Sequence, residues 1–375
     1  MKLILNAAEL TAALRLVGRR LPVRPAVPVM AGLQLTASGS TLTLATTDFE
    51  VTARAEIPAA VREEGTAVVP GRELRALART LPRQGDVDVT VEFGRAGLAF
   101  GTARVSIPVL PADEYPTLPG LASASASLPG RDFTRAVAQV ATAAGTDETL
   151  PVLTGVRLQF SHGWLKLTAT DRYRIASREL PVARTSANHP QGTYLLAAKA
   201  LKRTALDLRR AETVSIALPD AKDQPVTLSG SGGSFTHRPL ADLRLPTFES
   251  LVPTVFTTTV TLETRPLIDV LTRVGLVGER HVPAEFRIHP AGHLGIRSGT
   301  PNTVQVTDRL DTRTTTGEAM RITFNPVLLL EGLRALKCRT VQLSLTDPGK
   351  PALLHRHGAD RSALRYLLMP VRLQG

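Results

Sequence analysis

Hydrophobic and polar residues alternate most clearly from Leu165 to Thr170, a pattern typical of a strand with one buried face. A near copy, Leu42–Asp48, precedes this stretch, and a weaker copy, Leu294–Thr300, follows it. The copies lie about 125 residues apart, which is the usual size of one domain. The pattern therefore predicts one structural unit that is used three times.

Two amphipathic helices are predicted in each unit, because apolar residues recur there at three- and four-residue spacing. In the first helix this apolar stripe is Leu10, Ala13, Leu14 and Val17, and Asn6 stands before it as a cap. The predicted helices cover 7–20, 72–81, 131–144 and 197–210, with two more that begin after Thr264 and Asn325. The order of elements predicts an α+β fold of three repeated domains, each with two helices packed on antiparallel sheets.

Segments rich in proline mark the expected domain boundaries, because proline interrupts regular structure. One such segment runs from Pro108 to Pro119, and Pro246-Thr247-Phe248 later in the chain echoes Pro116-Thr117-Leu118. We expect domains at 1–121, 122–253 and 254–375.

The composition narrows the class of protein. The chain has 375 residues, a formal net charge of +12 and a single cysteine, Cys338. The charge favours an anionic partner, most commonly nucleic acid, and the lone cysteine favours a reducing, cytoplasmic compartment. The longest apolar runs are shorter than the 18 residues or so that a membrane-spanning helix needs, so no membrane partner is expected.

Basic side chains recur on the predicted helices, away from the apolar stripes. Evenly spaced cations of this kind suit phosphates better than base edges, so we expect one continuous surface that meets nucleic-acid phosphates without reading the base sequence. The candidate residues are Arg15, Arg19, Arg20, Arg24, Arg72, Arg75, Arg79, Arg131, Arg135, Lys199, Lys202, Arg203, Arg209, Arg210, Arg334 and Lys337.

Catalytic and metal-binding patterns are missing from the sequence. The histidine pairs His289/His293 and His355/His357 have no third ligand at metal-site spacing, so no metal or other cofactor is expected. Asp48 and Asp171 recur at the same place in two units, as a turn-forming aspartate would. The sequence predicts a non-catalytic protein.

The whole chain resembles the bacterial DNA sliding clamp, the beta subunit of DNA polymerase III. The resemblance rests on the three-unit plan, on the order and spacing of several motifs, and on the C-terminal ending. These motifs are Arg24-Pro25-Ala26-Val27-Pro28-Val29, Leu110-Pro111-Ala112-Asp113-Glu114-Tyr115-Pro116, Ala169-Thr170-Asp171-Arg172-Tyr173-Arg174-Ile175-Ala176, Leu336-Lys337-Cys338 and Tyr366-Leu367-Leu368-Met369-Pro370-Val371-Arg372-Leu373.

The resemblance implies a head-to-tail homodimer whose six domains close a ring around double-stranded DNA. It also implies a hydrophobic cleft between the middle and last domains that takes an extended peptide, containing Gln and Leu or Phe, from the replicative polymerase, the clamp loader and other partners. Arg174 and Arg372 are expected to bind peptide carbonyls. The matching cleft positions are Leu153, Thr170, Arg172, Tyr173, Arg174, Ile175, Pro246, Ser250, Leu251, Leu367, Met369, Pro370, Val371, Arg372 and Leu373.

Three features depart from the family pattern. Arg172 stands where many members have a small residue and Ser250 where some have arginine, so peptide preference is expected to differ. At the implied dimer contact, Val105 and Ile107 would face Leu276 and Val277 of the other copy, while the stretch 300–307 carries no charge. Ring closure is therefore expected to depend on apolar contact and on pairing of two edge strands.

The residues alone leave three hypotheses open: a DNA-encircling processivity factor, an enzyme of nucleic-acid metabolism, and a repeat-built adaptor that binds nucleic acid without forming a ring. The resemblance favours the first. Comparison of the two copies within the chain predicts that Tyr173, Arg174 and Ile175 have no equivalent after Asp48, where Phe49-Glu50-Val51 follows, so that the partner site lies where the middle unit departs from the repeat.

Overall fold

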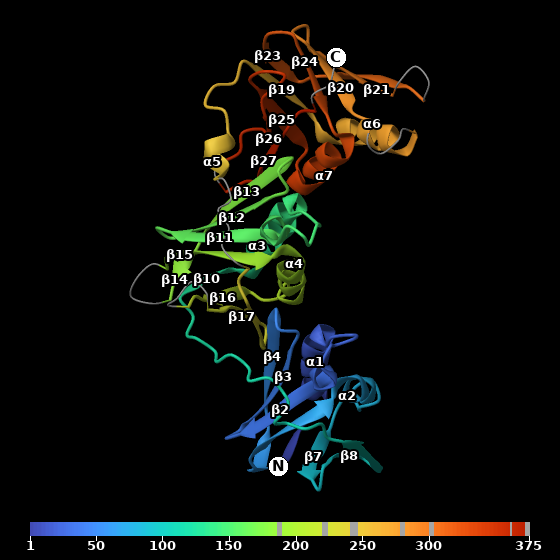
Figure 1. Cartoon of the computed structure of the whole chain (residues 1–375), viewed down its shortest axis with the longest axis vertical. Coiled ribbons are helices and arrows are strands. Elements are labelled where there is room, and N and C mark those ends of the chain that lie inside the picture. Colours follow the sequence, from blue (N-terminus) through green and yellow to red (C-terminus); the bar gives the residue numbers. More distant parts are fainter. Residues whose placement is uncertain are drawn as a thin grey trace. The chain divides into compact units, whose positions relative to one another are not determined.

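The fold was analysed in a computed structural model that describes residues 1–185, 190–219, 224–240, 247–277, 282–299, 304–360 and 362–371. The chain separates into two compact units. Unit 1 comprises 1–131, 183–190 and 203–239, and unit 2 comprises 132–182, 191–202 and 240–375. Figure 1 shows the elements of both units. The domain bounds near 121 and 253 stay a prediction.

Unit 1 contains two antiparallel sheets. The five-stranded sheet has the order β5-β1-β7-β8-β9, and the nine-stranded sheet has the order β14-β10-β16-β17-β18-β4-β3-β2-β6. The strands are β1 (Lys2–Asn6), β2 (Gly32–Ser38), β3 (Thr41–Thr47), β4 (Val51–Pro58), β5 (Ala60–Glu63), β6 (Gly65–Pro70), β7 (Asp86–Glu92), β8 (Arg95–Phe100), β9 (Ala103–Pro108), β10 (Ala126–Pro129), β14 (Ala183–Arg184), β16 (Thr213–Ala217), β17 (Val226–Gly230) and β18 (Gly233–His237).

Helices α1 (Ala7–Val17) and α2 (Gly71–Leu77) of unit 1 follow the predicted apolar stripes. Leu10, Leu14 and Leu74 are buried, and the Asn6 carboxamide oxygen accepts hydrogen bonds from the amides of Ala8 and Glu9. Both helices are shorter than predicted. After Val17 the chain forms a 3₁₀ turn, Gly18–Arg20, because the last turn tightens where intrahelical partners run out.

Unit 2 also contains two antiparallel sheets, with the orders β15-β11-β12-β13-β27-β26-β25-β19-β23 and β22-β21-β20-β24. The strands are β11 (Gly155–Ser161), β12 (Trp164–Thr170), β13 (Arg174–Pro181), β15 (Gly192–Ala197), β19 (Thr258–Glu263), β20 (Ala284–His289), β21 (His293–Ser298), β22 (Val306–Asp311), β23 (Thr314–Gly317), β24 (Met320–Phe324), β25 (Thr340–Leu345), β26 (Ala352–Arg356) and β27 (Arg365–Leu368).

The helices of unit 2 are α5 (Phe248–Leu251), α6 (Thr264–Val277) and α7 (Pro326–Leu336), while α3 (Gly130–Val140) and α4 (Ala198–Asp207) each contribute residues to both units. The cap predicted for α7 is confirmed, because the Asn325 side chain accepts from the amides of Val327 and Leu328. The short helix α5 was not predicted, since four residues carry no periodic signal.

The predicted repeat strands are present. Leu42–Asp48 covers all but the first residue of β3, and Leu165–Asp171 covers all but the first residue of β12. The leucines of both stretches are buried. The third copy contains β21, although its last residue, Thr300, lies outside the described residues. Within the described part of the chain, no helix is long and apolar enough to cross a membrane.

Candidate functional site

The chain turns in the same way after the two repeated strands. The Asp48 carboxylate accepts from the amides of Glu50 and Val51 at 3.1 and 2.7 Å, and the Asp171 carboxylate accepts from Tyr173 and Arg174 at 3.0 Å each. The prediction that both aspartates form turns is confirmed.

The residue that follows each aspartate has a left-handed backbone, with φ of 70° at Phe49 and 79° at Arg172. The expectation that the residues after Asp171 have no equivalent is therefore wrong. Glu50 and Tyr173 occupy matching backbone positions, and only the side chains differ.

The strands after these turns pair in the same register. Val51 pairs with His237 in unit 1, and Arg174 pairs with Leu368 in unit 2. The next amide donates back to the turn in both places: Arg238 to the Glu50 carbonyl at 2.9 Å, and Met369 to the Tyr173 carbonyl at 2.8 Å.

An apolar cluster supports the turn in unit 2. Ile175 and Leu367 face each other across β13 and β27, and they pack with Leu353 and with Phe248 of α5. These four side chains are buried, so Ile175 and Leu367 lie beneath the surface at the predicted cleft positions.

Apolar side chains close in the chain to these buried residues are exposed. Tyr173 is 66% exposed and Met369 is 41% exposed, and the main-chain hydrogen bond between them holds the two residues side by side. Leu251 is also exposed, on the helix whose Phe248 enters the cluster. Exposed apolar side chains on such a rigid base can pack against an extended peptide.

The guanidinium of Arg174 is buried and engaged within the protein. Its Nε donates to Asp171 at 2.8 Å, and its Nη1 donates to Glu331 and to the hydroxyl of Tyr366. Nε and Nη1 of Arg174 therefore link the turn after β12 to α7 and β27, and the expectation that Arg174 also binds peptide carbonyls stays a prediction. Arg172, by contrast, is exposed.

The other predicted cleft positions are distributed around this surface. Leu153 is half-buried and accepts a main-chain hydrogen bond from Gly145, which lies against Asp171. Thr170 is buried, Ser250 is exposed, and Pro370 and Val371 are half-buried. Pro246, Arg372 and Leu373 lie outside the described residues.

Fifteen of the sixteen predicted DNA-facing side chains are exposed. The exception is Arg20, which is buried: its guanidinium donates to Asp207 and Thr204 of α4 and stacks over the Phe235 ring. Assigning Arg20 to the DNA surface is therefore wrong. Its position three residues after Val17 continues the apolar stripe of α1, and this spacing could have revealed the burial.

Three of the exposed arginines gather at one point in unit 1. The guanidiniums of Arg75 and Arg203 donate to the carbonyls of Gly18 and Arg19 at the end of the first helix, and the Arg19 side chain pairs with Asp207 of α4. Carbonyls at a helix C-terminus carry partial negative charge, which accommodates this concentration of cations.

The two strands implied in dimer contact lie at sheet edges, β9 in unit 1 and β22 in unit 2. Val105 is half-buried and Leu276 is 80% exposed, but Ile107 is only 6% exposed. Most of the Ile107 side chain therefore packs inside its own unit, and its contact with a partner stays a prediction. The side chain of Val277 lies outside the described residues.

The edge strand of unit 2 begins at the end of the uncharged stretch and carries charges beyond it. The strand itself covers Val306–Asp311 and carries Asp308, Arg309 and Asp311, and the Asp308 carboxylate pairs with Arg273 of α6. The uncharged stretch precedes most of this strand.

The sequence did not reveal the polar links that join these elements. In unit 2 the Gln139 carboxamide donates to the Ala335 carbonyl at 2.7 Å and accepts from Arg178 at 2.6 Å. No group of three metal-ligating side chains is found among the described residues.

Comparison with known proteins defines the class to which this fold and surface belong. Family models for the N-terminal, central and C-terminal domains of the DNA polymerase III beta subunit match residues 1–119, 127–246 and 249–372. Among solved structures, the DNA polymerase III beta subunit of Pseudomonas aeruginosa matches with a TM-score of 0.90 at 23% identity, covering 100% of both chains. These matches define three clamp domains in an α+β fold.

A curated relative at higher identity identifies the family itself. The beta sliding clamp of Streptomyces coelicolor is 38% identical over 100% of both chains, and a beta sliding clamp homolog of Streptomyces muensis is 38% identical over 95% of both. The chain belongs to the beta sliding clamp family, the beta subunits of bacterial DNA polymerase III.

Proposed function

We propose that this chain is the processivity clamp of a replicative DNA polymerase and that it performs no catalysis itself. Two copies, joined head to tail, form a ring of six domains through which duplex DNA passes, and the ring works in the cytoplasm. The observation that carries the proposal is the full-length match to a curated beta sliding clamp.

The exposed arginines of the helices support the DNA-binding part of the proposal. Their side chains suit phosphates, which every DNA sequence presents alike, so the ring holds the duplex without a fixed register. Processivity then comes from topology, because a closed ring cannot leave DNA sideways.

The exposed apolar surface of unit 2 supports the partner-binding part. Tyr173, Leu251 and Met369 offer apolar contact, and Arg172 adds a charge at the rim. We propose that an extended peptide from the polymerase, the clamp loader or another partner packs here, with Leu373 and Arg372 contributing as the resemblance implies.

The topological mechanism is tested by retention on DNA. The protein is loaded onto a nicked circular plasmid with its clamp loader and ATP, and the bound fraction is followed before and after the plasmid is linearised. We expect retention on the circle and rapid loss from the linear form. Equal retention on both forms would instead support the adaptor that binds nucleic acid without a ring.

The peptide surface is tested separately. Met369→Ala and Tyr173→Ala are each expected to weaken a labelled peptide containing Gln, Leu and Phe by about tenfold, measured by fluorescence anisotropy, because such anchors dominate peptide contacts. We expect the affinity of dimerisation, measured by sedimentation, to stay unchanged. Unaltered peptide affinity in both variants would place the partner site elsewhere.

A further inference from the structure

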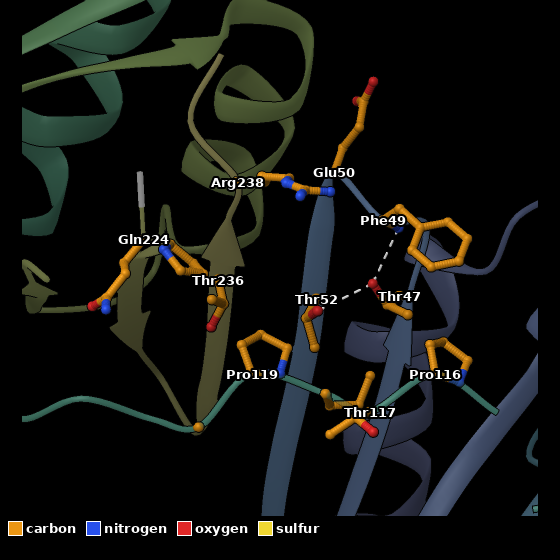
Figure 2. A pocket seen from close by; sticks show the side chains of 13 residues that line it. Thr47, Phe49, Glu50, Thr52, Pro116, Thr117, Pro119, Gln224, Thr236 and Arg238 are labelled. Atoms are coloured by element: carbon orange, nitrogen blue, oxygen red, sulfur yellow. Dashed lines mark hydrogen bonds between the residues drawn. The ribbon is translucent and has the colours of Figure 1, made fainter. Parts of the chain in front are cut away.

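A cavity of about 580 Å³ opens in unit 1 beside the turn at Asp48 (Figure 2). Its walls come from Phe49, from the segment Pro116–Gly120 and from Gln224 and Pro225, and Arg238 stands at its rim. Cavities of this size accommodate a small ligand or a few side chains of a peptide. The cavity lies entirely within unit 1 and is separate from the cleft residues, all of which belong to unit 2.

The main chain around the cavity repeats that of the cleft in unit 2. The aspartate turn, the left-handed residue after it, the register of the next strand pair and the returning amide of Arg238 all match their counterparts around Tyr173 and Met369. The backbone positions that Tyr173 and Met369 occupy in unit 2 are therefore occupied by Glu50 and Arg238 in unit 1.

Different side chains explain why this copy is hollow. In unit 2 the aligned residues Ile175, Leu367 and Leu353 form an apolar base that Phe248 covers. In unit 1 the aligned residues are Thr52, Thr236 and Thr227.

These threonines are buried and bond to one another and to their neighbours. The Thr52 hydroxyl donates to Thr47 at 3.1 Å, and the hydroxyls of Thr227 and Thr236 lie 2.9 Å apart. Leu118 packs instead against the separate cluster that contains Val29, Met30 and Tyr115. Thr52 and Thr236 thus give this side of the cavity a polar lining, and among the described residues Phe49 is the one aromatic side chain that lines it.

The residues around the cavity define the chemistry of an occupant. Phe49 is 57% exposed, and Figure 2 shows Pro116 and Pro119 below it among the lining residues, so an apolar side chain can pack against them. The hydroxyls of Thr52 and Thr236 can still accept hydrogen bonds from main-chain amides, since each oxygen has two lone pairs.

Charge at the rim adds a preference for an anion. Among the described residues, the Arg238 guanidinium has no hydrogen-bond or ion-pair partner, while the Glu50 side chain extends away from the prolines (Figure 2). A carboxylate can therefore reach Arg238 with little opposition, and the net charge of +12 attracts acidic segments at longer range.

We propose that this cavity is a second peptide-binding site, which takes an extended segment of a protein partner carrying an acidic residue next to an apolar one. The choice of a peptide rests on the proposed function of the matching cleft in unit 2, whereas the acidic preference rests on Arg238. One ring would then offer two kinds of docking site with different sequence preferences.

The test uses a phage-displayed library of random dodecapeptides and the full-length protein with Tyr173→Ala and Met369→Ala, which disable the unit 2 cleft. Selected peptides are synthesised, and their affinities are measured by fluorescence anisotropy. We expect an acidic residue beside an aliphatic or aromatic one, and affinities at least tenfold weaker for Phe49→Ala and for Arg238→Glu. In the selected peptide, replacing the acidic residue by its amide is expected to weaken binding to the protein that retains Arg238. The same replacement should have little effect on binding to the Arg238→Glu variant.

Folding and specificity are controlled in the same experiment. Arg62→Ala, an exposed change on β5, leaves the affinity unaltered, and circular dichroism verifies that each variant is folded. Failure to enrich any peptide, or peptides that bind Phe49→Ala and Arg238→Glu as tightly as the parent, would overturn the second site. Neither result would contradict the proposed ring, because retention on circular DNA tests the ring separately.

Discussion

The guanidinium of Arg20 donates to the carboxylate of Asp207 at 3.1 Å, and both side chains are only 3% exposed. Arg20 ends the first helix segment and Asp207 ends α4, so this pair joins parts of unit 1 that are far apart in the sequence. Removing one member of a buried pair leaves the other charge without its partner in a medium of low dielectric constant.

We therefore expect Arg20→Ala to lower the free energy of unfolding of unit 1 by about 3 kcal/mol. Arg19→Ala is the matched control, because Arg19 contacts the same carboxylate from an exposed position and should cost under about 1 kcal/mol. Hydrogen exchange of unit 1 peptides measures both. Equal effects of the two changes would contradict a specific role of the buried pair.

His237 supplies a pH dependence to the same region. The imidazole is fully buried and bonds to the Thr204 hydroxyl at 2.9 Å, and burial together with the nearby Arg20 charge lowers the pKa of His237 to about 3. The unfolded histidine has its ordinary pKa near 6.5, so the unfolded chain binds the extra proton as pH falls. The stability contribution is complete above about pH 6.5 and is lost progressively toward pH 3.

We expect the unfolding free energy of unit 1 to fall between pH 7 and pH 5 with a slope approaching about 1.4 kcal/mol per pH unit from this one proton. His237→Gln should flatten that slope, whereas His162→Gln, at an exposed position, should preserve it. Hydrogen exchange of unit 1 across this pH range measures the slope. If His237→Gln left the pH dependence of the unfolding free energy unchanged, a group other than His237 would be responsible for the proton uptake.

Substitutions of Arg174 and of Arg172 are expected to have different effects in unit 2, the first on stability and the second on peptide binding. Arg174→Gln breaks the links to Asp171 and Glu331, and we expect it to lower the free energy of unfolding by about 2 kcal/mol. Arg172→Ala should change peptide affinity and leave stability within about 0.5 kcal/mol. The single tryptophan, Trp164, lies in β12, so its fluorescence reports on unit 2. A loss of peptide affinity in Arg174→Gln without a loss of stability would contradict this structural role of Arg174.

Leu276 and Ile107 offer a similar separation at the proposed dimer contact. Leu276→Asp places a charge on an exposed position and should weaken dimerisation at least tenfold without unfolding the chain. Ile107→Ala should mainly lower stability, by about 2 kcal/mol, because it leaves a cavity inside its own unit. Sedimentation gives the dimer affinity and thermal unfolding gives the stability. A dimer that tolerates Leu276→Asp would exclude α6 from the contact.

The amino-acid sequence by itself determined the repeated fold. Strand alternation at Leu42 and Leu165, the apolar stripe of α1 and the cap at Asn325 all depend on neighbouring residues along the chain. Periodicity records such local geometry directly, so these features were predicted well, whereas the ends of the helices were misplaced and the four-residue helix α5 was missed.

Tertiary structure alone decided which polar side chains face solvent. Arg20 and Arg174 are as basic as their exposed neighbours, but each meets a carboxylate from a segment more than 150 residues away in the chain. Those partners, like the hollow beside Asp48, follow from how strands pair across the sheets, which local periodicity does not encode. The sequence therefore set the elements, and long-range packing decided which charges became internal links and which stayed available to DNA and partners.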